Sequence, residues 1–84
     1  MEFKVGQIFQ HYYANSRPQP IGVEYFLITE VNATGLRYIY NTDTGGKGYN
    51  YNSFEEFKDR MAQKAPYGVT LVMNAELIRI KYFE

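Results

Sequence analysis

Three acidic residues near the middle of the chain are the first side chains whose spacing could serve chemistry. Glu55, Glu56 and Asp59 lie close together in the sequence. Acid–base catalysis by paired carboxylates requires two such groups that are close in space. Their spacing also fits the first turns of a helix that begins at Ser53. There, negative charge interacts favourably with the helix dipole, and Glu56 completes a capping box. We interpret them as the solvated face of a helix, not as catalytic carboxylates.

His11 is the only histidine, and the chain has no cysteine. A metal site at His11 would need its other ligands from carboxylates, and none lies at a ligand spacing from it. Ser16 and Ser53 carry hydroxyl nucleophiles, but catalysis also requires a base and an orienting group, and no such set can be assembled. Without cysteine there are no disulfides and no thiolate chemistry. The sequence therefore predicts a protein that is not an enzyme and binds no metal or cofactor. A small-molecule enzyme ranks last among the functions considered, because no nucleophile, base and orienting group can be assembled.

A glycine-rich segment around Lys47 invites comparison with phosphate-binding loops, since Gly45, Gly46 and Gly48 surround this lysine. Such a loop requires the pattern GxxxxGK followed by Ser or Thr at the start of a helix. Here Gly48 follows the lysine, and a tyrosine-rich segment comes next. We interpret the segment as the tip of a β-hairpin.

Tyrosine is the unusual residue of the composition, with nine in 84 residues. A tyrosine ring is apolar but its hydroxyl needs a partner or water, so a domain this small must leave several rings at its surface. The segments on either side of the glycine-rich tip each carry two tyrosines. Because alternate residues of an antiparallel pair share a face, these four rings are expected to form one aromatic patch. The predicted partner-binding residues are the four tyrosines and two basic neighbours: Tyr38, Tyr40, Tyr49, Tyr51, Arg37 and Lys47.

Tyrosine and arginine are enriched at protein interfaces, which favours a binding module whose partner is another protein or a second copy of the chain. The loop around Pro18 and Pro20 is a second candidate surface. A competing interpretation is that the tyrosines only cover a thin core. The alternative function is nucleic-acid binding by aromatic stacking. It is disfavoured because nine Lys and Arg balance nine Asp and Glu, although folding could gather a basic patch from Arg37, Lys47, Arg79 and Lys81.

The elements that must position these side chains follow from hydrophobic periodicity. Strands are expected over residues 3–13 with a bend near Gly6, then 23–31, 36–41 and 49–52, with one helix at about 53–65. After the helix, residues 69–73 and 77–83 are expected to form two strands, or one long strand with an irregularity at 74–76. Two prolines and a glycine make residues 14–22 an exposed loop. Phe54, Phe57 and Met61 form the apolar stripe of the helix. The predicted core is Phe3, Ile8, Phe26, Leu27, Ile28, Ile39, Phe54, Phe57, Met61, Leu71, Ile78 and Ile80.

These elements predict one α+β, mostly β domain over residues 1–84, built on a small, strongly bent antiparallel sheet or barrel of about five or six strands. In strand count and length it resembles SH3-like barrels. The chain has no motif of a particular SH3-like family, so no functional residues can be assigned from this resemblance. No apolar run approaches the roughly 20 residues that span a bilayer, and no signal peptide is evident, so a cytoplasmic location without membrane contact is expected. From size alone, we hypothesise an accessory or inhibitor protein of a phage or mobile element.

Overall fold

The computed structural model describes residues 2–13, 22–42, 46–63 and 68–84. The predicted loop at 14–22, with Ser16, Pro18 and Pro20, lies almost wholly outside these residues, as do Gly45 at the predicted hairpin tip and the end of the predicted helix. The elements in chain order are β1 (Ile8–Tyr13), β2 (Gly22–Val31), β3 (Gly35–Thr42), β4 (Lys47–Ser53), α1 (Phe54–Ala62), β5 (Val69–Leu71) and α2 (Ala75–Phe83).

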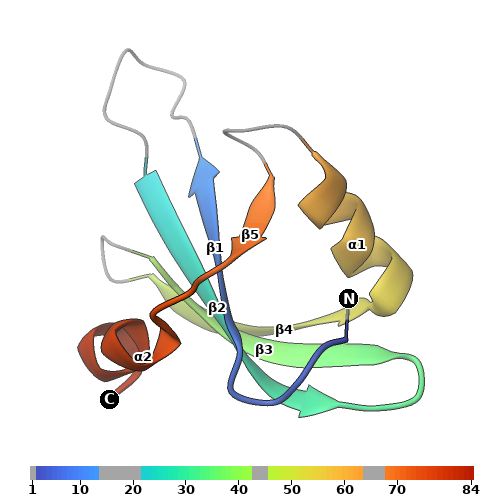
Figure 1. Ribbon diagram of the computed structural model, residues 1–84, viewed down its shortest axis with the longest axis horizontal. Helices are drawn as coiled ribbons and strands as arrows, with labels where there is room; N and C mark the ends of the chain where they lie inside the picture. Colours follow the sequence, from blue (N-terminus) through green and yellow to red (C-terminus); the bar gives the residue numbers. More distant parts are fainter. Residues whose placement is uncertain (1, 14–21, 43–45, 64–67) are drawn as a thin grey trace.

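The five strands form one antiparallel sheet in the order β4-β3-β2-β1-β5, and the two helices lie on opposite sides of it (Figure 1). We call the side that carries Phe26 and Ile28 the α1 face, and the side that carries Tyr25 the α2 face. The predicted α+β, mostly β class is confirmed. The sheet is open, since no pairing joins β4 to β5 in the described part of the chain. The barrel form of the prediction is therefore not confirmed.

The first strand is shorter than predicted because the chain turns before it. Gly6 has a φ of 95°, a left-handed conformation that glycine adopts without steric cost. Its N–H donates to the carbonyl of Ile28 (2.9 Å), and the Ile28 N–H donates to the carbonyl of Gln7 (3.0 Å). The predicted bend near Gly6 is thus present, and regular strand begins only at Ile8. Phe3 still reaches the core from the segment before the turn.

Helix α1 starts as its sequence predicts. The Ser53 hydroxyl accepts from the Glu56 N–H (3.1 Å), and the Glu56 carboxylate accepts from the Ser53 N–H (2.8 Å). This reciprocal capping box satisfies two donors that the first turn of a helix otherwise leaves free. The helix buries Phe57 completely and packs the half-buried Phe54 and Met61 against the same core.

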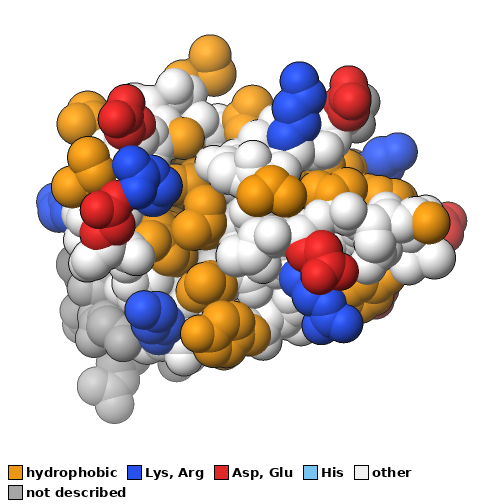
Figure 2. Space-filling view, turned by 90° about the horizontal axis from the view of Figure 1, so that it is seen from below, with side chains coloured by type: hydrophobic (Ala, Val, Ile, Leu, Met, Phe, Trp, Pro, Cys, Tyr) orange, Lys and Arg blue, Asp and Glu red, His pale blue; other side chains and the backbone are white. Residues whose placement is uncertain are grey.

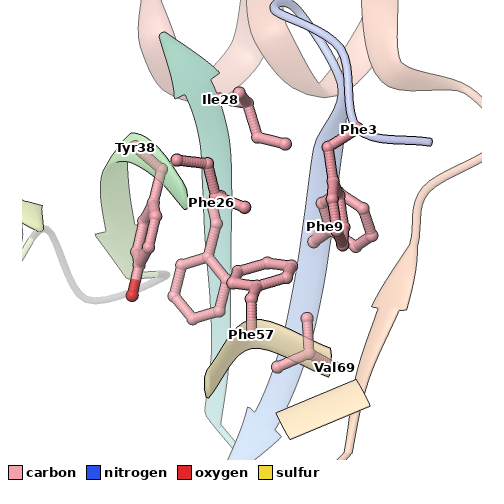
Figure 3. Packing of buried hydrophobic residues seen from close by; sticks show 8 residues of the cluster. Phe3, Phe9, Phe26, Ile28, Tyr38, Phe57 and Val69 are labelled. Carbon is pink, nitrogen blue, oxygen red and sulfur yellow. The ribbon is translucent and has the colours of Figure 1, made fainter. Parts of the chain in front are cut away.

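The core lies between the sheet and α1, and its side chains are mostly aromatic (Figure 3). The ring of Phe57 lies 5.0 Å from that of Phe9 and 5.5 Å from that of Phe3, both in edge-to-face arrangements, which aromatic pairs favour. The prediction placed Phe3, Ile8, Phe26, Ile28 and Phe57 in the core correctly. It missed five residues that are also buried: Phe9, Leu36, Tyr38, Val69 and Val72.

The predicted last strand, 77–83, is wrong, because Ala75–Phe83 is the helix α2. The Asn74 carbonyl accepts from the N–H groups of Leu77 and Ile78 at the first turn. A strand that pairs with β5, its predecessor in the chain, would need the outer edge of β5, which lies beside α1 (Figure 1). Away from a sheet edge, the leucine, glutamate, arginine and lysine of this segment have good helix propensity.

Helix α2 rests on the α2 face through Tyr82, whose ring lies 4.7 Å from that of Tyr25. Its other side is apolar and open, with Leu77 66% and Ile80 51% exposed. Placing Ile80 in the core was therefore wrong, because helical geometry turns it away from the half-buried Ile78. Hydrophobic side chains gather, with charged ones among them, on the half of the molecule that carries α2 (Figure 2). Neither helix in the described residues is long and apolar enough to cross a membrane.

Candidate functional site

The register of β3 and β4 separates the four tyrosines that were expected to share one patch. Tyr38 lies opposite Asn50, and Tyr49 lies opposite Ile39. Because directly opposed residues point to the same side of a sheet, Tyr38 and Tyr40 fall on the α1 face, and Tyr49 and Tyr51 on the α2 face. The prediction of a single four-ring patch is wrong.

Tyr38 is a core residue, with 1% of its surface exposed. Its ring packs against those of Phe26 (4.9 Å) and Phe57 (5.7 Å). Its hydroxyl donates to Asn52 Oδ1 (2.7 Å) and accepts from Arg60 (2.9 Å) and Asn50 (3.2 Å). Burial raises the pKa of Tyr38, and the nearby Arg60 charge opposes this only in part. Tyr38 is therefore a hydrogen-bonded part of the core that no partner can reach without unfolding.

Tyr40 also has a structural role, because its ring packs over Gly48. A Cβ built at Gly48 would lie 2.4 Å from the Tyr40 hydroxyl and 2.6 Å from Cζ of its ring. The ring therefore lies across the glycine, which has no side chain to displace it. This contact covers backbone that Gly48 would otherwise leave bare on the α1 face.

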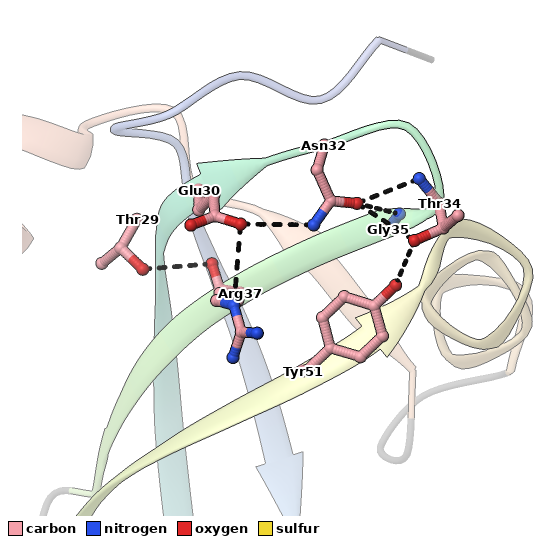
Figure 4. A network of polar contacts seen from close by, with 7 residues as sticks. All are labelled: Thr29, Glu30, Asn32, Thr34, Gly35, Arg37 and Tyr51. Carbon is pink, nitrogen blue, oxygen red and sulfur yellow. Dashed lines mark hydrogen bonds and ion pairs between the residues drawn. The ribbon is translucent and has the colours of Figure 1, made fainter.

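Tyr51 and Arg37 are held together on the α2 face by a ring of polar contacts (Figure 4). The Arg37 guanidinium lies 5.6 Å from the centre of the Tyr51 ring, and its Nε lies 3.6 Å from a Glu30 carboxylate oxygen. The Tyr51 hydroxyl is 2.7 Å from Thr34 Oγ1. The Asn32 side chain connects the Glu30 contact with the Thr34 contact. It donates to Glu30 and accepts from Thr34 and Gly35.

Gly35 is required where the Tyr51 ring crosses the strand. A Cβ at this position would lie 2.7 Å from the Tyr51 hydroxyl and 2.2 Å from the Asn52 carbonyl oxygen. Both distances are shorter than van der Waals contact, and the second involves backbone that cannot move aside. The side chain of Tyr51 is thus fixed by its neighbours before any partner arrives.

Tyr49 projects from the α2 face beside this ordered pair and is 80% exposed. An open hollow of about 500 Å³ lies here, bordered by Thr29, Arg37, Tyr38, Tyr49, Asn50 and Tyr51. We call Arg37, Tyr49 and Tyr51 the tyrosine face. Helix α2 meets the sheet nearby, at Tyr25 and at Asn41, whose side-chain amide donates to the Tyr82 carbonyl. The hollow has both polar and aromatic walls, as ligand-binding and active-site pockets do.

The basic residues do not act as one free patch. Arg37 contacts Glu30, and Arg79 contacts Glu84. Lys81 Nζ lies 5.4 Å from the centre of the Tyr82 ring. Lys47 is exposed at the start of β4, where it could contact a partner near the tyrosine face.

The remaining titratable side chains have structural contacts. His11 Nδ1 lies 3.4 Å from Glu24 Oε1, and the imidazole stacks near Phe26 at 6.4 Å. Ser53 and Glu56 form the helix cap, and that hydrogen bonding lowers the pKa of Glu56. Among the residues that the structure describes, no three of His, Asp and Glu are grouped as metal ligands.

Comparison with protein-family models, with curated proteins and with solved structures gave no match to this chain.

Sequence reasoning missed the polar residues that support the tyrosine face, namely Glu30, Asn32 and Thr34. Asn32 does carry a local signal, because asparagine before a turn often accepts from the backbone two residues on. The Glu30–Arg37 pair depends on the β2–β3 register and on a bulge between Ile28 and Glu30, and neither can be derived from spacing alone.

Proposed function

We propose that this chain is a non-enzymatic protein-binding module and that the tyrosine face is its contact surface. The observation that carries the proposal is the 80% exposure of Tyr49 beside a tyrosine and an arginine that are already held in place. A large aromatic ring left in water on a rigid sheet is the kind of anchor that dominates binding energy at protein interfaces.

The order of the neighbouring side chains supports this proposal. Immobilising a flexible side chain on binding costs about 0.5–1.5 kcal/mol. Tyr51 is held by its contact with Thr34, and Arg37 lies at ion-pair distance from Glu30, so part of that cost is met during folding. Tyrosine itself loses little conformational entropy for the area that it buries.

Nucleic-acid binding is the second candidate, since an exposed ring beside a cation is also how proteins stack single-stranded bases. The contact of Arg37 with Glu30 and the formal net charge of zero argue against it, because polyanions are held mainly by unpaired cations. A heparin column run at two salt concentrations separates the two. Strong, steeply salt-dependent retention would support nucleic acid, and weak retention at both would support a protein partner.

The narrower hypothesis is an accessory or inhibitor protein of a phage or mobile element, acting in the cytoplasm. It is supported only by the length of 84 residues and the lack of cysteine.

Replacing Tyr49 with Ser tests the surface. Because Tyr49 is so exposed, this substitution should change the free energy of unfolding by less than about 0.5 kcal/mol. It removes an interface anchor that contributes about 2 kcal/mol, so partner binding should weaken about 30-fold. The measurement is quantitative mass spectrometry of proteins captured from native lysate by wild-type and variant bait.

Leu77→Ser is the matched control, since Leu77 is 66% exposed on α2, outside the tyrosine face. Proteins retained by wild type and by this control but lost with Tyr49→Ser support the proposal. Equal capture by all three baits, or equal loss from both variants, contradicts it. Tyr51→Ser is a poorer test because it also breaks the contact with Thr34.

A further inference from the structure

Strand β4 is an edge of the sheet with a defined set of backbone groups that point outward. The Thr42 N–H donates to the Gly46 carbonyl, and the Phe54 N–H donates to the Thr34 carbonyl. In an antiparallel pair, hydrogen-bonded and non-hydrogen-bonded pairs alternate along the strand. These two bonds therefore assign Gly48, Asn50 and Asn52 to the β3 side and direct the backbone groups of Lys47, Tyr49, Tyr51 and Ser53 away from the sheet.

Two of the outward N–H groups already have local acceptors. The Ser53 N–H donates to Glu56, and the Tyr51 N–H donates to Asn50 Oδ1 at 2.9 Å. In the described part of the chain only β3 pairs with β4, so the outward groups of Tyr49 meet no second strand.

The edge has little of the protection that edge strands normally carry. Natural edges are blunted by charged side chains, proline, bulges or short length. Over its seven residues, β4 has one charge, at Lys47, no proline and no shift in register against β3. At the opposite edge, β5 has only three residues and lies beside α1. The β4 edge is therefore the one available for pairing.

We propose that β4 pairs antiparallel with β4 of a second copy of this chain, about a twofold axis at Asn50. In this register Tyr49 of each copy lies opposite Tyr51 of the other. Both are residues whose backbone groups point outward, as a hydrogen-bonded pair requires. The Tyr51 N–H exchanges its bond to Asn50 for one to the partner's backbone.

The side chains fit a second copy better than an unrelated strand. The twofold register places Tyr49 across from Tyr51 twice on the same face, and aromatic cross-strand pairs stabilise sheets. It also brings Lys47 of each copy to the Ser53 end of the other, where the Glu56 carboxylate lies because it accepts from the Ser53 N–H. Two attractive charge pairs form in the dimer, and neither exists in the monomer.

The inference concerns the edge of β4, which shares Tyr49 and Tyr51 with the tyrosine face, so its tests use substitutions that keep both rings. A dimer would place two tyrosine faces side by side on one continuous sheet. If only the partner capture described above fails, the edge pairing still stands. If only the dimer fails, the tyrosine face remains a candidate on a single chain.

The molar mass in solution, from light scattering during gel filtration, tests the proposal. Wild type should approach twice 9.9 kDa as its concentration rises toward about 1 mM. Lys47→Glu sets a carboxylate against the partner's Glu56 and should weaken dimerisation at least about tenfold. Lys4→Glu is the control, because it makes the same charge change on the segment before β1 and should leave the mass unchanged.

A cysteine at the twofold axis tests the register. Directly opposed residues have Cβ atoms about 4.5–5.5 Å apart, which small backbone shifts can close to disulfide distance. Since the chain has no cysteine of its own, Asn50→Cys should give a disulfide-linked dimer under mild oxidation. Thr70→Cys, exposed on β5, should give no disulfide-linked dimer in the same conditions.

A single-chain mass for wild type at the highest concentration would overturn the proposal and leave the edge as a site for an extended strand of another protein. A dimer that Lys47→Glu does not weaken, or equal crosslinking of the two cysteine variants, would also overturn it.

Discussion

Tyr38 combines a core position with a hydroxyl that has three polar partners. The Arg60 guanidinium lies over the Phe26 ring at 4.8 Å while donating to this hydroxyl. A buried hydroxyl without partners would be costly, and a buried cation more so. The two groups hydrogen-bond to each other at the margin of the core. A phenylalanine at this position would remove one hydrogen-bond partner from each of Arg60 and Asn52.

The raised pKa of Tyr38 predicts a loss of stability at alkaline pH. Its pKa in the folded chain lies above the ordinary value of 10.0 because burial disfavours the phenolate. The unfolded chain releases the proton first, so the free energy of unfolding falls as pH rises above about 10.0 and levels off beyond the folded pKa. Urea unfolding at several alkaline pH values should show a steeper fall for wild type than for Tyr38→Phe. Parallel curves for the two proteins would contradict this assignment.

Helix α1 is the element that the sequence predicts most clearly, through its capping box. Ser53 and Glu56 lie three residues apart, so the box depends only on local geometry, which a sequence encodes directly. The segment 77–83 gave the opposite result. Its alternation of apolar and charged residues matches a strand, but the sheet edge that precedes it in the chain, that of β5, lies beside α1, and helix α2 forms instead. Alternation predicts a strand only where a partner strand is present.

Removing the Ser53 hydroxyl should destabilise α1 by about 0.5–2 kcal/mol, because the Glu56 N–H loses its acceptor. Ser53→Asp should be nearly neutral, since a carboxylate accepts the same bond and favours the helix dipole. Chemical denaturation of wild type and both variants measures the difference. Equal losses from the two substitutions would show that the cap contributes little.

The same cap has a pH signature. Hydrogen bonds from Ser53 lower the pKa of Glu56 below its ordinary value of 4.5. Because this pKa is lower in the folded chain than in the unfolded chain, the ionised carboxylate stabilises the fold fully at pH values above the unfolded-state pKa. This stabilisation is lost as the pH falls through the folded-state pKa. The stability difference between wild type and Glu56→Gln should therefore narrow below about pH 4.5, and a constant difference would argue against the bond.

Across the whole molecule, what the sequence predicts well is burial within one element. Phe26 and Ile28 in one strand and Phe57 in the helix are placed correctly because periodicity alone assigns their faces. Register between strands is different. The two tyrosine-bearing segments suggest tyrosine opposite tyrosine, whereas Tyr38 lies opposite Asn50. A shift of one residue moves every side chain to the other face, so the candidate site was only half predicted.

Phe57 joins the parts of the fold and should therefore control the stability of the whole molecule. Its ring contacts the rings of one residue before the sheet and of three residues in strands β1, β2 and β3: Phe3, Phe9, Phe26 and Tyr38. Phe57→Ala leaves a cavity among these rings and should lower the free energy of unfolding by about 3–5 kcal/mol.

The matched control for this substitution is Leu77→Ala, which removes an exposed apolar side chain from α2 and should cost less than about 0.5 kcal/mol. Urea unfolding is followed by far-ultraviolet circular dichroism, which reports the backbone, and by tyrosine fluorescence, which reports side-chain packing. Because one aromatic core joins α1 to the sheet, both signals should shift together in Phe57→Ala and keep a single transition. A loss below about 1 kcal/mol, or separate transitions for the two signals, would mean that α1 is not part of the cooperative core.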